Sequence, residues 1–169
     1  MSKSKRVAYC GVLTALALIF SYVESLIPIN FGVPGIKLGL ANLIVLLGLY
    51  FLPAGQVLII SIMRILLSGF MFGNAMSIIY SLAGGFLSFL IMLLLKKTKF
   101  SIMGMSIAGG VSHNIGQLLV AMIVLSTAKL FFYLPALMIS GVITGALIGI
   151  LSGGVIQVVS READRSLRK

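Results

Sequence analysis

Long apolar runs, separated by a few short polar breaks, dominate this sequence. The chain has 169 residues, of which 60% are hydrophobic and 9% are charged. Soluble domains usually carry roughly a quarter of their residues as charged side chains. So few charged residues cannot cover a water-facing surface. The sequence therefore predicts an all-α integral membrane protein with one transmembrane domain over residues 1–169.

The apolar runs have the length of membrane-spanning helices. Such a helix needs about 20 apolar residues, within a working range of roughly 17–25. Six runs fit, and proline- and glycine-containing breaks, a lysine cluster and Lys129 separate them. We predict a bundle of six transmembrane helices over residues 7–27, 36–52, 54–71, 74–95, 104–128 and 131–158.

The basic residues indicate how the bundle is oriented. Ten of the thirteen lie in three clusters: before the first run, between the fourth and fifth runs, and after the last. Six spans place all three clusters on one side of the membrane. The positive-inside rule then predicts that both termini are cytoplasmic, in a multi-pass protein of the cell membrane. The net charge of +10 thus reflects topology, and we expect no nucleic-acid partner.

The two chain ends and the single cysteine complete this description. The stretch "YVESLIPIN" offers no small-x-small cleavage site, so the first run is expected to be a retained span. The closing "SREADRSLRK" is expected to be a helical tail at an anionic leaflet. Cys10 has no second cysteine with which to form an intramolecular disulfide or a cysteine metal cluster.

Small residues recur at four-residue steps on three of the predicted helices. Such faces let helix backbones approach closely in lipid. We expect the faces of the fourth and sixth spans to pack within the bundle, whereas the first could equally contact a cytoplasmic partner. These positions are Gly73, Ser77, Ser81 and Gly85, then Gly141, Gly145, Gly149 and Gly153, and in the first span Gly11 and Ala15.

Polar residues gather in the outer half of the predicted bundle. Depth along each span, at about 1.5 Å per residue, brings polar groups from five helices to a similar level. Intramembrane polar groups are costly, so they are either paired structurally or functional. We interpret them as a substrate-binding pocket that opens outward, lined by Glu24, Lys37, Asn42, Arg64, Asn74, His113, Asn114 and Gln117.

Each of these residues also has a structural explanation. Glu24 and Arg64 could form a buried ion pair, Asn74 could cap a helix, and Asn42 could cross-link helices. The loop at 28–37 could cover the pocket as a lid or be an ordinary connector. His113 is the one histidine and no carboxylate cluster accompanies it, so we expect neither a metal site nor a cofactor.

Two stretches, "PGIKLGLANLI" at 34–44 and "GGVSHNIGQL" at 109–118, carry a resemblance to a known family. Together with the small-residue first helix and the six-span plan, they resemble the Gx transporter family. That family is also labelled heptaprenyl diphosphate synthase component I. It is related to the substrate-binding S components of energy-coupling factor (ECF) transporters. The resemblance covers residues 7–158.

The resemblance implies a fold, a function and partners. S components are six-helix proteins that bind a nutrient in an outward-facing pocket, which the first outer loop helps to line. A small-residue motif on their first helix, usually Ala-x-x-x-Ala, docks on a coupling membrane subunit served by two ATPases. Gly11 and Ala15 stand at those positions here. The resemblance thus implies an S component for a small, anionic or carbonyl-rich nutrient or cofactor precursor.

The synthase label can be tested against the acidic residues. Prenyl transfer uses aspartate-rich motifs to hold magnesium, which requires oxygen ligands. The chain has only Asp164, Glu24 and Glu162, so we expect that it is not an enzyme. One alternative is a non-catalytic membrane subunit associated with quinone, isoprenoid or flavin-linked redox machinery. A further alternative, an ion-coupled carrier using Glu24 and His113, is disfavoured because no internal repeat is evident.

Overall fold

The computed structural model describes residues 3–27 and 37–167, and these ranges are helical with short connections. The predicted lid over 28–37 therefore lies, except for Lys37, outside the described residues. No strand occurs in the described ranges, which confirms the all-α prediction. The elements are α1 (Lys3–Leu26), α2 (Asn42–Phe51), α3 (Ala54–Phe72), α4 (Ala75–Lys96), α5 (Ile102–Val124), the 3₁₀ helix η1 (Ala128–Tyr133) and α6 (Leu134–Leu167).

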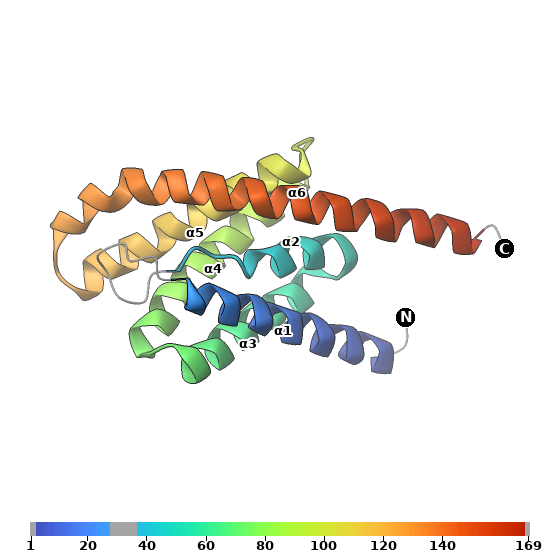
Figure 1. Ribbon diagram of the computed structural model, residues 1–169, viewed down its shortest axis with the longest axis horizontal. Helices are drawn as coiled ribbons and strands as arrows, with labels where there is room; N and C mark the ends of the chain where they lie inside the picture. Colours follow the sequence, from blue (N-terminus) through green and yellow to red (C-terminus); the bar gives the residue numbers. More distant parts are fainter. Residues whose placement is uncertain (1–2, 28–36, 168–169) are drawn as a thin grey trace.

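Five of the described helices are long and apolar enough to cross a membrane: α1, α3, α4, α5 and α6. The chain is thus a multi-pass membrane protein. The helices run back and forth between two ends of an elongated bundle, and α1 begins at the same end at which α6 finishes (Figure 1). The end of the bundle that faces the cytoplasm stays a prediction from the basic clusters.

The caps explain several helix boundaries. At the start of α4, Ser77 N–H donates to Asn74 Oδ1 at 2.8 Å, and Asn74 N–H donates to Ser77 Oγ at 3.0 Å. This reciprocal capping box satisfies amide groups that have no partner within the helix. Ser101 caps α5 by accepting a hydrogen bond from Gly104 N–H at 3.0 Å. Pro53 precedes α3, where its missing N–H is harmless.

The second predicted span, 36–52, is not a full membrane-spanning helix. Only α2, with ten residues, is helical there, and residues 37–41 before it are not. Ten helical residues extend about 15 Å, half of a hydrocarbon core about 30 Å thick. The correction is physical: Gly39 has φ = +86°, a left-handed backbone that interrupts the helix. Residues 37–51 thus form an irregular segment followed by a half-length helix.

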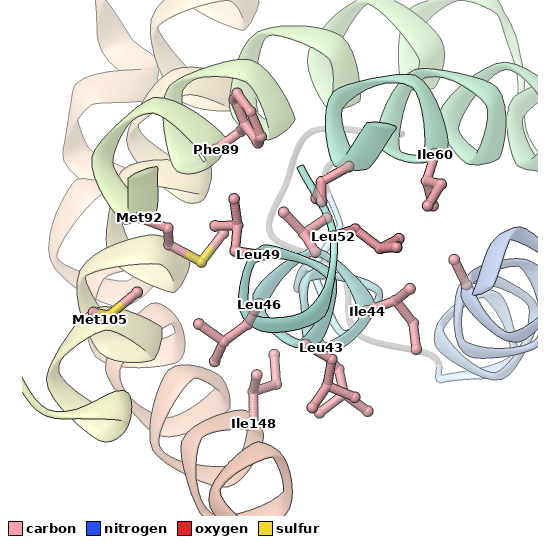
Figure 2. Close-up of a cluster of buried hydrophobic side chains, with 14 residues drawn as sticks. Leu43, Ile44, Leu46, Leu49, Leu52, Ile60, Phe89, Met92, Met105 and Ile148 are labelled. Atoms are coloured by element: carbon pink, nitrogen blue, oxygen red, sulfur yellow. The ribbon is translucent and has the colours of Figure 1, made fainter. Parts of the chain in front are cut away.

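Helix α2 lies at the centre of the bundle. It contacts α1, α3, α4, α5 and α6, and residues 42–49 are all buried. Figure 2 shows Leu43, Leu46 and Leu49 pointing from α2 toward side chains of the surrounding helices, among them Met92 and Ile148. A helix that is apolar on every side is stable when protein or lipid surrounds it. The leucine-rich sequence of α2 meets that condition.

Two of the small-residue faces pack as the sequence predicts. On α6, a Cβ added at Gly141, Gly145 or Gly149 would lie 2.9, 2.6 or 2.9 Å from a backbone Cα of α5. Only glycine permits this approach of α6 to α5. On α4, Ser77 and Ser81 are buried, and Gly85 packs against α3. Gly153 has no atom within 4 Å of an added Cβ, so the close contact ends before it.

Candidate functional site: a polar cluster around a broken helix

The irregular segment 37–41 is held at its start by a glutamine of α5. Lys37 N–H donates to Gln117 Oε1 at 2.9 Å, and Gln117 Nε2 donates to the Lys37 carbonyl at 2.8 Å. The Gln117 side chain is fully buried. The Gln117 side chain thus pairs with both the N–H and the carbonyl of Lys37, 80 positions away. A neighbouring β-strand would pair with the same two backbone groups. Irregular backbone at membrane depth needs partners of this kind.

Glu24 of α1 holds the next part of the segment. Gly39 N–H donates to Glu24 Oε1, and the Glu24 side chain is only 5% exposed. The N-cap residue of α2 is Ala41, whose side chain makes no capping hydrogen bond. The Glu24 carboxylate therefore lies close to the start of α2, where the helix dipole favours a negative charge.

The opposite end of α2 has the opposite charge nearby. Lys96 at the end of α4 donates through Nζ to the Leu49 carbonyl, and Nζ lies 5.7 Å from the centre of the Tyr50 ring. A cation is favourable at a helix C-terminus. The short central helix thus has Glu24 near its first turn and Lys96 at its last.

Gly39 brings Asn42 and His113 together. A Cβ added at Gly39 would lie 2.9 Å from His113 Cδ2 and 3.0 Å from Asn42 Nδ2. Both side chains are at most 3% exposed. Gly39 therefore lies against both the α5 histidine and the α2 asparagine, and no larger residue fits at this position. The sequence analysis did not single out Gly39, although it stands inside "PGIKLGLANLI".

Arg64 of α3 joins the cluster through Asn42. Arg64 Nη2 donates to Asn42 Oδ1 at 3.4 Å, and the arginine is 2% exposed. The Glu24 side chain accepts a hydrogen bond from Gly39 N–H. A direct Glu24–Arg64 ion pair, the predicted structural alternative, stays a prediction.

The remaining predicted residues lie in different surroundings. Asn114 Nδ2 donates to the Leu137 carbonyl of α6 at 2.7 Å, which makes this side chain a link between α5 and α6. Asn74 is exposed and caps α4, so the structure does not bring it into the cluster. Lys37 is half-buried. We use "polar cluster" below for the contacting set Glu24, Gly39, Asn42, Arg64 and His113, together with Lys37 and Gln117.

Several buried polar atoms of these residues have no hydrogen-bond partner in the part of the chain that the structure describes. They are Glu24 Oε2, Asn42 Nδ2, Arg64 Nε, His113 Nδ1 and Asn114 Oδ1. Leaving such a buried group unpaired costs about 1–3 kcal/mol, and more for a charged group. Most buried polar groups are paired, so this concentration marks the cluster as a candidate binding site.

Metal chemistry finds no support in the described ranges. Residues 3–27 and 37–167 hold no group of three or more histidine, cysteine, aspartate or glutamate side chains able to hold a metal ion. The cluster offers one carboxylate, two cations and several amides. That combination can bind a small polar or anionic molecule through charge and hydrogen bonds.

The small-residue face of α1 contrasts with the polar cluster in position and burial. Gly11 and Ala15 are both exposed, and a Cβ added at Gly11 would have no atom within 4 Å. Within α1 (Lys3–Leu26), Gly11 lies in the first half, Ala15 at the middle and Glu24 in the last turn. The fold thus leaves this face of α1 without a partner among the described residues.

Fold and site define a class: a small multi-pass membrane protein that holds a buried polar cluster around an interrupted helix. The chain belongs to the family described as heptaprenyl diphosphate synthase component I, whose model matches residues 13–155. This confirms the family resemblance inferred from the two sequence stretches. The description names one component of a synthase, and together with the apolar helices it indicates a membrane-associated component of a complex. Neither the curated proteins nor the solved structures contain a match to the chain.

Proposed function

We propose that the protein is the substrate-binding membrane subunit, or S component, of an ECF-type uptake transporter. The observation that carries this proposal is the opposition of two features along α1. At one end, Glu24 belongs to a buried polar cluster with unpartnered atoms. In the first half of the helix and at its middle, Gly11 and Ala15 form an exposed face on which a partner helix could pack.

The chemistry of the cluster favours a small anionic or carbonyl-rich nutrient or cofactor precursor. Arg64 and Lys37 supply positive charge, while Asn42 and His113 supply hydrogen bonds. Asn114 and Gln117, which the sequence analysis also assigns to substrate binding, position the surrounding backbone through their contacts with Leu137 and Lys37. Catalysis is not part of the proposal, because the described cluster offers a single carboxylate.

Energy for uptake would come from partners, because the sequence contains no "GxxxxGK[ST]" phosphate-binding motif. The proposed partners are a coupling membrane subunit, which would dock on Gly11 and Ala15, and two ATPases. The basic clusters favour cytoplasmic termini. This would place the docking face in the inner half of the membrane and the polar cluster in the outer half.

The test is affinity purification of the tagged protein from its native membranes in a mild detergent, followed by mass spectrometry of the bound proteins. Recovery of a coupling subunit with paired ATPases is the expected result. Recovery of a prenyl synthase or redox proteins without ATPases would overturn it. That outcome would favour the second candidate, a non-catalytic membrane subunit of quinone, isoprenoid or flavin-linked redox machinery, which the family description supports.

A further inference from the structure

The charges around the polar cluster do not balance. The chain has three acidic residues, and two of them, Glu162 and Asp164, stand at the far end of α6. Glu24 alone is left to face Arg64 and Lys37. Residues 28–36, the connection between α1 and this segment, contain no charged residue in the sequence. The cluster therefore carries one positive charge more than its own residues can neutralise.

The partners already engaged limit how a ligand can bind. One oxygen of Glu24 is occupied by Gly39 N–H, and one nitrogen of Arg64 donates to Asn42 Oδ1. Two donor atoms, Arg64 Nε and Asn42 Nδ2, have no hydrogen-bond partner among the described residues. The acceptor atom Glu24 Oε2 also has none there. Each of the three side chains is at least nine-tenths buried.

We propose that the ligand is a small organic monoanion: a carboxylate with a hydroxyl or amino hydrogen-bond donor next to it. The carboxylate oxygens accept from Arg64 Nε and Asn42 Nδ2, and the adjacent donor reaches Glu24 Oε2. One negative charge balances the excess of the cluster. This inference rests on the proposed function, since it names the substrate class of the same site.

The same accounting of charge disfavours a diphosphate, the group that the family description brings to mind. A diphosphate carries more negative charge than Arg64 and Lys37 can offset while Glu24 stays ionised. Diphosphates are usually held through magnesium, whose ligands are oxygen atoms such as carboxylates. Only one carboxylate is available in the cluster.

The experiment extracts small molecules from the purified protein and identifies them by liquid chromatography and mass spectrometry. Wild type is compared with Lys37→Gln and Arg64→Gln, and with Lys129→Gln as a control that removes an exposed cation of η1. The Lys37→Gln variant keeps its fold because the Lys37 backbone, not its side chain, makes the described hydrogen bonds. Inorganic pyrophosphate is the probe for the alternative, with the unfolding temperature as readout.

We expect one carboxylate monoanion to be enriched on wild type and on Lys129→Gln. On Lys37→Gln its recovery should fall about tenfold, because the cluster then has no excess positive charge to balance the carboxylate. Pyrophosphate should leave the unfolding temperature unchanged. An extract dominated by a diphosphate or a neutral compound, or one without any enriched compound, would overturn the inference. Co-purification of ATPases alongside such an extract would leave the proposed function standing and remove only the ligand class.

Discussion

The two small-residue faces on α1 and α6 have the same four-residue spacing, but only the face on α6 packs against another described helix of the chain. On α6, Gly145 packs so closely on α5 that an added Cβ would lie 2.6 Å from Ile107 Cα. On α1, Gly11 faces open space at the same four-residue spacing from its neighbour Ala15. A small-xxx-small pattern therefore predicts close helix contact but does not say with which helix. The small-residue face on α1 contacts no helix among the described residues, so it is available to another subunit.

The largest expected effect comes from filling the α5–α6 contact. Gly145→Ala should lower the free energy of unfolding by about 3 kcal/mol or more, because the new Cβ meets backbone that cannot move aside. Thermal unfolding in detergent measures this. Gly153→Ala, on the same helix with no atom within 4 Å of its Cβ, is the control and should unfold like wild type. Equal unfolding temperatures for the two variants would contradict the close packing.

The next effect concerns the break before α2. Gly39→Ala should cost about 2 kcal/mol, because an alanine at φ = +86° is strained and its Cβ meets His113 and Asn42. Chemical denaturation would report the change, with Gly55→Ala, a glycine in open surroundings on α3, as the matched substitution. A Gly39→Ala protein as stable as Gly55→Ala would mean that α2 can extend toward residue 36 as a regular span.

A loss of similar size is expected when the glutamine that holds Lys37 is replaced. Gln117→Leu leaves the Lys37 N–H and carbonyl without their described partners, at a cost of about 1–3 kcal/mol. Gln56→Leu is the control, since the half-buried Gln56 makes only a weak contact with Cys10 Sγ at 4.0 Å. Hydrogen exchange at residues 37–41 should rise in Gln117→Leu alone. Unchanged exchange there would show that other groups hold the segment.

The smallest effect on stability should come from the exposed face. The double variant Gly11→Leu, Ala15→Leu should change the free energy of unfolding by no more than about 0.5 kcal/mol, because the new side chains extend into open surroundings. The same thermal unfolding assay applies. A large loss would mean that the face packs within this chain, and the contrast with α6 would disappear.

The sequence predicts most of the helices but not how the second predicted span is built. Apolar length and flanking breaks locate α1, α3, α4 and α5 and the start of α6 within a few residues, because lipid imposes a helical backbone and a minimum length. Helix α6 continues to Leu167, nine residues past the predicted end of the last span. The run at 36–52 has the same apolar length, so this rule does not predict that its helix is interrupted. What breaks the helix is Gly39 together with Glu24 and Gln117, and Gln117 lies 80 residues from the backbone that it contacts.

The candidate site was predictable as a group of residue types rather than as a set of contacts. Depth along each span brings Glu24, Asn42, Arg64 and His113 to one level, and the structure does bring these four together. Depth cannot give rotation about the helix axis, which decides that Asn114 faces Leu137 and that Asn74 is exposed. Nor could it reveal that Glu24 would contact Gly39, since that depends on the irregular backbone of the segment.

We propose that the exposed α1 face docks a partner while the polar cluster binds substrate. The most direct test is affinity purification from native membranes of wild type, of the double variant Gly11→Leu, Ala15→Leu, and of Gly154→Leu, an exposed glycine of α6 in open surroundings. We expect wild type and Gly154→Leu to retain a coupling subunit with its ATPases and the double variant to lose them while staying folded. Equal recovery of these partners by all three proteins would contradict it.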